Sequence, residues 1–389
     1  MLVSLSLIIM TGFALKGIFQ KLGLPGLLGM LLSGILLGPH VLNLIAPDIL
    51  VISADLRKIA LIVILVRAGL ALDLKDLKKV GRPALLMCFV PASFEIIGVT
   101  LLAPWLLHIP YLEAAILGAI LGAVSPAIVV PKMLHLMESG YGKTHSVPQL
   151  IMAGASVDGV YNIVLFTTFM GLFAGQGFSP VGLLKVPVSI ITGIGTGIAL
   201  GLVLSWLFKQ IHIRDTVKVM IILGVAFLIV GLETQITRYV PFSGLLAVVG
   251  LGGTILKTYE LLAKRLAGKF SRIWVAAELV VFVLLGAIVD IRYIPKAGLA
   301  VVVLILGALA FRSIGVLVSV SWSKIPWKAR LFCTIAYLPK ATVQAALGSL
   351  PLAAGVASGS MILTTAVIAI LMTSPLGEIG IEKTYRKLL

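Results

Sequence analysis

Charged residues are scarce in this chain. Of its 389 residues, 12% are Asp, Glu, Lys or Arg, whereas a soluble domain carries roughly 25%. Acidic residues are the scarcer kind, with 15 against 31 basic ones, and 60% of the chain is hydrophobic. With a mean hydropathy of +1.15, this composition excludes a soluble protein with a single core and predicts an all-α integral membrane protein.

Motifs for disulfides, metal centres and enzyme chemistry are also missing. The two cysteines, Cys88 and Cys333, lie in apolar segments without a CxxC pair, which indicates packing rather than a disulfide or a zinc site. The sequence has neither HExxH nor GxSxG, and the run GKT at Gly142 lacks the upstream glycine of a phosphate-binding loop. We therefore expect no enzymatic activity and no cofactor.

The net charge of +16 would suit a nucleic-acid-binding protein if the basic residues shared one face with aromatic or polar readers. They lie instead between long apolar runs, so we expect no nucleic-acid partner and a lipid bilayer as the surroundings. The first apolar run begins at Leu2 with no basic segment before it, which favours a spanning helix over a cleavable signal peptide.

The apolar runs are long enough to cross a bilayer, which takes about 20 residues per helix. They predict about thirteen spans, at residues 2–21, 25–44, 54–73, 82–107, 112–136, 147–173, 182–208, 216–234, 242–257, 272–291, 297–321, 329–351 and 358–376. One set of alternate connections carries 21 Lys and Arg residues and the other carries six. Because basic connections stay in the cytoplasm, we expect the N-terminus outside and the C-terminus inside. As the location we expect a bacterial inner membrane, with the chain as a multi-pass protein.

Two short matches between distant spans indicate an internal repeat. The triplet GLL begins at Gly26 and again at Gly244, each with another glycine eight residues later. The run GLALDLKDLKKVG from Gly69 matches GAIVDIRYIPKAG from Gly286. Matched spans are seven apart and therefore cross the membrane in opposite directions, as in the inverted repeats of secondary transporters. The predicted parts are a first repeat at about 1–173, a linker helix at about 182–208, a second repeat at about 216–376 and a short cytoplasmic tail at 377–389.

Prolines interrupt two spans that this repeat would pair. Pro126 lies near the centre of span 112–136 and Pro339 near the centre of span 329–351. Each proline removes a backbone donor and obstructs the preceding helical turn. One such proline indicates a packing kink, but two at paired positions predict discontinuous helices that form a substrate site near mid-membrane.

Lys340 directly follows the second of these prolines, about half-way along its span. A cation at the bilayer centre costs at least about 2.5–3.5 kcal/mol on insertion scales and normally has a partner. Asp158 lies near the middle of span 147–173. The expected local arrangement is a Lys340–Asp158 ion pair.

The sequence resembles the monovalent cation:proton antiporter superfamily, especially its sodium/proton exchanger branch. The motifs that carry the resemblance are GAVSPAIVVPKML from Gly122, PQLIMAGASVDG from Pro148, FVLLGAIVDI from Phe282 and PKATVQAALG from Pro339. The resemblance extends over nearly the whole chain. It implies a core domain with two crossed discontinuous helices, a dimerisation domain, and a homodimer that works by an elevator-like alternating-access motion.

The resemblance also implies a carboxylate on span 147–173 that binds a monovalent cation and protons competitively. Na+ is the expected cation, with Li+ and K+ as alternatives, and Asp158 is the expected carboxylate. A partly desolvated carboxylate beside backbone carbonyls holds either a proton or a dehydrated cation, and one disfavours the other. The residues expected around the transported ion are Asp158, Ser156, Gly159, Ser125, Pro126, Lys340, Thr342 and Gln344, with Asn162 as a further polar group near the breaks.

The sequence departs from the family at Gly159. Electrogenic members have two successive acids here, and an ungapped match places Asp158 at the first and Gly159 at the second, which is the family's principal cation ligand. A shift by one position would instead match the Asp-Gly of electroneutral members, with Val157 in place of Asn. One position is about 100° of helix rotation, so the face of Asp158 stays open. So do three interpretations: Asp158 is the sole carrier, the ligand set suits another ion, or the chain is an inactive variant.

Other charges in the spans have structural interpretations. Glu278 and Arg312 resemble family positions where a charged pair stabilises the core domain. Arg67 and Asp73 are expected at the membrane interface, and Lys16 is expected to reach the cytoplasmic surface with its ammonium group.

Two rival functions remain beside cation/proton exchange. A homologue without coupling would act as an ion uniporter or channel, which passes current without proton movement. A sodium-coupled organic-anion symporter is the other alternative, because related inverted-repeat folds carry such solutes, and substrate-dependent sodium uptake would identify it.

Overall fold

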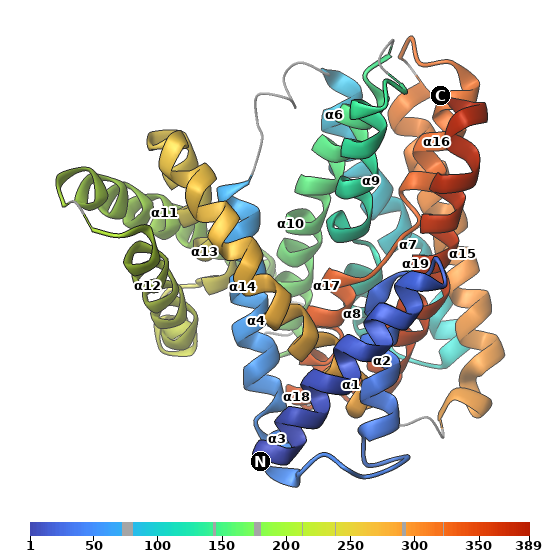
Figure 1. Cartoon of the computed structure of the whole chain (residues 1–389), viewed down its shortest axis with the longest axis horizontal. Helices are drawn as coiled ribbons and strands as arrows, with labels where there is room; N and C mark the ends of the chain where they lie inside the picture. Colours follow the sequence, from blue (N-terminus) through green and yellow to red (C-terminus); the bar gives the residue numbers. More distant parts are fainter. Residues whose placement is uncertain are drawn as a thin grey trace. The chain divides into compact units, whose positions relative to one another are not determined.

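The computed structural model describes residues 1–71, 81–142, 145–174, 180–211, 213–237, 239–289, 293–321 and 323–389. All regular secondary structure within these ranges is helical. In chain order the helices (Figure 1) are α1 (Leu2–Lys21), α2 (Gly26–Leu37), α3 (Pro47–Val51), α4 (Ser53–Leu70), α6 (Arg82–Met87), α7 (Val90–Leu107), α8 (Tyr111–Leu121), α9 (Pro126–Glu138), α10 (Val147–Phe173), α11 (Pro180–Gln210), α12 (Asp215–Ile236), α13 (Gly244–Thr258), α14 (Glu260–Ala287), α15 (Tyr293–Ser321), α16 (Trp327–Ala336), α17 (Thr342–Leu347), α18 (Leu350–Ala353) and α19 (Gly359–Leu388).

Eight helices in the described part of the chain are long and apolar enough to cross a membrane. The all-α membrane architecture expected from the sequence is thus confirmed, and each expected span contains at least one helix. The number thirteen stays a prediction. Three boundaries were clearly wrong. α2 ends at Leu37 rather than at 44, because Pro39 cannot continue a helix. α14 begins at Glu260 rather than at 272, and α19 extends to Leu388 rather than ending at 376, so most of the expected tail at 377–389 is helical.

The chain divides into two compact units. The first comprises residues 1–54, 73–166 and 281–389, and the second comprises residues 55–72 and 167–280. Both units are assembled from segments far apart in the sequence. The expected repeat boundaries and the expected dimerisation domain stay predictions.

In the first unit, α7 packs along α15 through glycines that let the two helices approach closely. Gly98 of α7 lies against the ring of Phe311, and Gly315 of α15 lies against the backbone of Pro91. A side chain at either glycine would collide with these neighbours. This contact brings the middle of α7 beside Arg312, the residue after Phe311.

A second close approach in the first unit joins α2 to the end of α14. Gly34 packs against the backbone of Val283 and Ala287, and Gly286 packs against the backbone of Leu31. Backbone atoms occupy the space that a Cβ would need at each glycine. Small residues of this kind are how helices approach each other in membranes, where packing replaces the hydrophobic effect as the driving force.

The second unit has a corresponding approach between α4 and α13. Gly252 packs against the backbone of Gly69 and Leu70, and Gly69 packs against the backbone of Val249. The second unit also contains α11 packed along α13, with Gly197 of α11 against the carbonyl of Ala247.

Candidate functional site

The helix expected at 112–136 is interrupted at the segment GAVS before Pro126. α8 ends at Leu121 and α9 begins at Pro126. Proline has no N–H to donate to the carbonyl four residues back, so the helical hydrogen bond to Gly122 is not made. The interruption was expected from the sequence and is confirmed.

Backbone donors freed by this break are satisfied from elsewhere in the chain. The N–H of Val124 donates to Asp158 Oδ2 over 2.7 Å. The N–H of Ser125 donates to the carbonyl of Pro339 over 2.8 Å. The two interrupted helices therefore meet at their breaks.

The free carbonyls at the end of α8 accept hydrogen bonds from two side chains of the expected span 329–351, where the second interruption lies. Gln344 Nε2 donates to the carbonyls of Ile120 (3.0 Å), Leu121 (3.3 Å) and Ala123 (2.8 Å). Lys340 Nζ donates to the Leu121 carbonyl over 2.5 Å. A cation at a helix C-terminus is stabilised by the partial negative charge there. Lys340 and Gln344 thus satisfy backbone carbonyls at the end of α8 that have no partner within the helix.

The second break separates α16, which ends at Ala336, from α17, which begins at Thr342. Its exposed backbone is bonded by α19: Thr373 Oγ1 accepts from the N–H of Lys340 (3.0 Å), and Ser374 Oγ donates to the Lys340 carbonyl (2.6 Å). Non-helical backbone at membrane depth is tolerated where other protein groups satisfy it.

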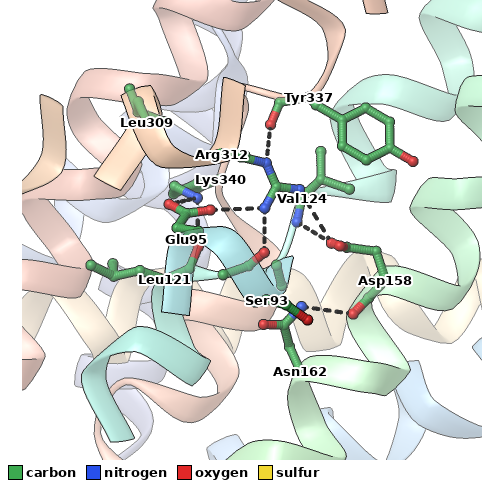
Figure 2. A network of polar contacts seen from close by, with 12 residues as sticks. Ser93, Glu95, Leu121, Val124, Asp158, Asn162, Leu309, Arg312, Tyr337 and Lys340 are labelled. Carbon is green, nitrogen blue, oxygen red and sulfur yellow. Dashed lines mark hydrogen bonds and ion pairs between the residues drawn. The ribbon is translucent and has the colours of Figure 1, made fainter. Parts of the chain in front are cut away.

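Arg312 of α15 lies between the two breaks and two carboxylates, as Figure 2 shows. Its Nε donates to the Tyr337 carbonyl over 2.6 Å, and its Nη1 donates to the Gly122 carbonyl. Nη1 also lies 2.8 Å from Glu95 Oε2, and Nη2 lies 3.4 Å from Asp158 Oδ2. The side chain is fully buried, and its planar fork of donors suits several acceptors at once.

Lys340 pairs with Glu95 of α7. Its Nζ lies 2.6 Å from Glu95 Oε1, and both side chains are buried. Among the described residues, the carboxylate of Asp158 pairs with Arg312. The predicted Lys340–Asp158 pair is therefore wrong, because Glu95 takes the place beside Lys340 and Asp158 pairs with Arg312.

Asp158 itself is completely buried on α10 and faces the first break. Oδ2 accepts from Val124 and Arg312, while Oδ1 has no hydrogen-bond partner. A buried carboxylate oxygen without a partner carries a desolvation cost. A proton or a cation bound to this oxygen would remove that cost.

The remaining expected site residues fall into three groups. Ser125, Thr342 and Gln344 are buried at the breaks, and Oγ of Ser125, Oγ1 of Thr342 and Oε1 of Gln344 have no hydrogen-bond partner. Pro126 forms the first turn of α9, and Gly159 is buried on α10. The side chain of Ser156 lies outside the described residues.

One of the structural roles expected for the other charged residues is corrected by the structure. Arg312 is buried, but its acidic partners are Glu95 and Asp158, so the predicted pair with Glu278 is wrong. Glu278 belongs to the second unit, where it interacts electrostatically with Arg67. Asp73 lies outside the described residues. Lys16 is partly buried, with its ammonium group 5.9 Å from the ring of Phe13.

Glu95 is the site residue that sequence reasoning missed. It stands alone in the apolar run VPASFEIIGVTLL, near the middle of an expected span. An isolated acid at such a position normally has a buried partner or a function, so this signal was available. What the sequence did not provide was its location beside Lys340 and Arg312.

Comparisons with known proteins show the family and the fold. The family described as sodium/hydrogen exchanger, transmembrane, matches residues 5–384. Human sodium/hydrogen exchanger 9B2 is 34% identical over 379 residues, which cover 92% of this chain and 68% of that protein. Human sodium/hydrogen exchanger 9B1 is 30% identical, over 92% of this chain and 71% of that protein.

The fold matches a solved structure as well. The sodium proton antiporter MjNhaP1 from Methanocaldococcus jannaschii superimposes with a TM-score of 0.84 at 22% identity, over 99% of this chain and 97% of that one. Fold and sequence together define a multi-pass membrane antiporter. The chain belongs to the sodium/hydrogen exchanger family. The expected bacterial inner membrane and the orientation of the termini stay predictions.

Proposed function

We propose that this chain exchanges Na+ for protons across a membrane by alternating access, with Asp158 as the carboxylate that both ions share. The observation that carries the proposal is the buried Oδ1 of Asp158, which faces the interrupted helices without a partner. Membership of the exchanger family supports the reaction. The buried position of the acid supports its role, since a desolvated carboxylate gains from binding either ion.

The charges around Asp158 support a one-for-one exchange. Arg312 and Lys340 carry two positive charges, and Glu95 and ionised Asp158 carry two negative ones. The network is therefore neutral when Asp158 is empty and carries the same single positive charge with either ion bound. Exchange of one Na+ for one proton then moves no net charge across the membrane.

Alternating access in this proposal rests on an inverted repeat, and the glycine contacts support it. Leu31 lies five residues after Gly26, and Val249 lies five residues after the matched Gly244. Leu31 contacts Gly286, and Val249 contacts Gly69, which matches Gly286 in the repeat. The contact of α2 with α14 thus has its counterpart in the contact of α13 with α4.

The reciprocal contacts follow the same rule. Gly34 and Gly252 are matched positions. Gly34 contacts Ala287, the residue after Gly286, and Gly252 contacts Leu70, the residue after Gly69. A two-fold relation between the repeats would produce such an exchange of partners.

We further propose that the protein works as a homodimer, which chemical crosslinking in liposomes would test.

Purified protein in liposomes tests the function. We expect an inward Na+ gradient to alkalinise the lumen as protons leave, at a rate that a potassium-valinomycin voltage clamp does not change. Asp158→Asn is expected to abolish exchange. The variant is expected to remain folded, because Arg312 still donates hydrogen bonds to Glu95 and to two backbone carbonyls. Undiminished exchange by the variant refutes Asp158 as carrier, and a Na+ current without proton movement identifies a uniporter instead.

A further inference from the structure

Several buried side-chain oxygens near the breaks have no hydrogen-bond partner, and Asn162 contributes one of them. In the described part of the chain these include Oδ1 of Asp158 and Oδ1 of Asn162. Both residues are completely buried. Buried polar atoms are rarely left unpaired, so each one needs an explanation such as a bound ion.

Asn162 lies one helical turn after Asp158, on the same face of α10. Its Nδ2 donates to the carbonyl of Asp158 over 2.8 Å, as Figure 2 shows. This bond directs the amide nitrogen back along the helix and leaves Oδ1 as the free end of the side chain. Oδ1 lies directly against Gly122, where a Cβ would collide with it. The amide oxygen is therefore held at the first residue of the break.

Position 159 contributes no side chain to this region. A Cβ added to Gly159 would meet only Val343 Cγ2, at 3.6 Å, so neighbouring atoms leave room for a Cβ there. Asp158 is consequently the one carboxylate that α10 directs at the first break. A site with a single carboxylate needs neutral oxygens to replace the hydration shell of a cation.

We propose that Oδ1 of Asn162 is a direct ligand of the transported cation and, together with Oδ1 of Asp158, replaces the second carboxylate that a two-acid site would carry at position 159. This inference rests on the proposed function and adds a ligand to the same site. Hard cations bind carboxylate and amide oxygens. An amide oxygen lowers the desolvation cost of the cation without adding a charge that a second proton would have to neutralise.

Na+ binding to purified protein, measured by titration calorimetry, tests the ligand independently of transport. We expect Asn162→Ala to weaken Na+ binding by roughly 10- to 100-fold, the usual effect of losing a group that supports a metal site. Asn162→Asp keeps the shape of the side chain and is expected to tighten Na+ binding. Adding Gly159→Asp to Asn162→Ala is expected to restore binding, which loss of a purely structural hydrogen bond would not allow.

Tyr161→Phe is the matched control. Tyr161 neighbours Asn162 on α10, and its hydroxyl lies 2.7 Å from Ser93 Oγ, so its loss removes a polar contact between helices while the proposed ligands stay. We expect unchanged Na+ binding. The inference is overturned if both Asn162→Ala and Asn162→Asp bind Na+ within about twofold of the unaltered protein, less than about 0.4 kcal/mol. Wild-type protein that binds Na+ without exchanging it for protons would refute the proposed function and leave the ligand test intact.

Discussion

Glu95 and Lys340 form a buried ion pair, with Oε1 2.6 Å from Nζ. The same carboxylate reaches Arg312 through Oε2 at 2.8 Å. One acid on α7 thus pairs with two basic side chains. Lys340 donates to a carbonyl at the end of α8, and Arg312 donates to a carbonyl at the end of α16. Glu95 was not expected from the sequence to be part of the site.

Neutralising this acid should destabilise the protein strongly. Glu95→Gln would leave Lys340 buried without a counter-charge, and breaking a buried pair typically costs about 3–5 kcal/mol. We expect a large fall in melting temperature in detergent, measured by intrinsic fluorescence. The double variant Glu95→Leu with Lys340→Met removes both charges and should recover much of the loss. A double variant less stable than either single one would contradict the pairing.

The exposed ion pair of Lys132 provides the contrasting case. Its Nζ lies 3.4 Å from Glu378 and 3.1 Å from Glu382, with side-chain exposures of 29%, 23% and 57%. Pairs in contact with water contribute about 0.2–1 kcal/mol. Lys132→Ala is therefore expected to lower the melting temperature only slightly, in the same assay as Glu95→Gln. A loss as large as that of Glu95→Gln would show that this pair has a further structural role.

An acid placed next to Asp158 should alter transport. Only Val343 lies near a Cβ at Gly159, so Gly159→Asp is expected to fold normally. A second carboxylate should increase the affinity for Na+ and allow a second proton to be exchanged, which makes transport sensitive to voltage. Flux in liposomes at imposed potentials measures this. Unchanged affinity together with voltage-independent flux would argue against the ungapped match of Asp158 and Gly159 to the two-acid motif.

Two glycines of α14 provide a matched test of helix packing. Gly286 contacts the backbone of Leu31, whereas nothing lies within 4 Å of a Cβ at Gly268. Gly286→Ala is expected to cost about 1–3 kcal/mol by overpacking. Gly268→Ala should be neutral or stabilise by roughly 0.5–1 kcal/mol, because alanine favours the helix. Equal melting temperatures of the two variants would contradict the close approach of α2 and α14.

The architecture followed from local properties of the sequence. Apolar length located the helices, and Pro126 and Pro339 located the two interruptions, because proline prevents helical hydrogen bonding wherever it lies. Lys340 and its acidic candidate Asp158 were recognised because a charge within an apolar run has a high insertion cost, whereas Arg312 was recognised by its resemblance to a family position. These inferences needed no knowledge of which helices are neighbours.

The partners of those charges were decided only by the tertiary structure. Asp158 was a plausible partner for Lys340, yet Glu95 takes that place and Asp158 pairs with Arg312. An ion pair forms over a few ångströms between groups brought together by helix packing, and close contacts between backbones at glycines set that packing. Sequence by itself determined where charge is buried; the packing of the helices determined which charges meet.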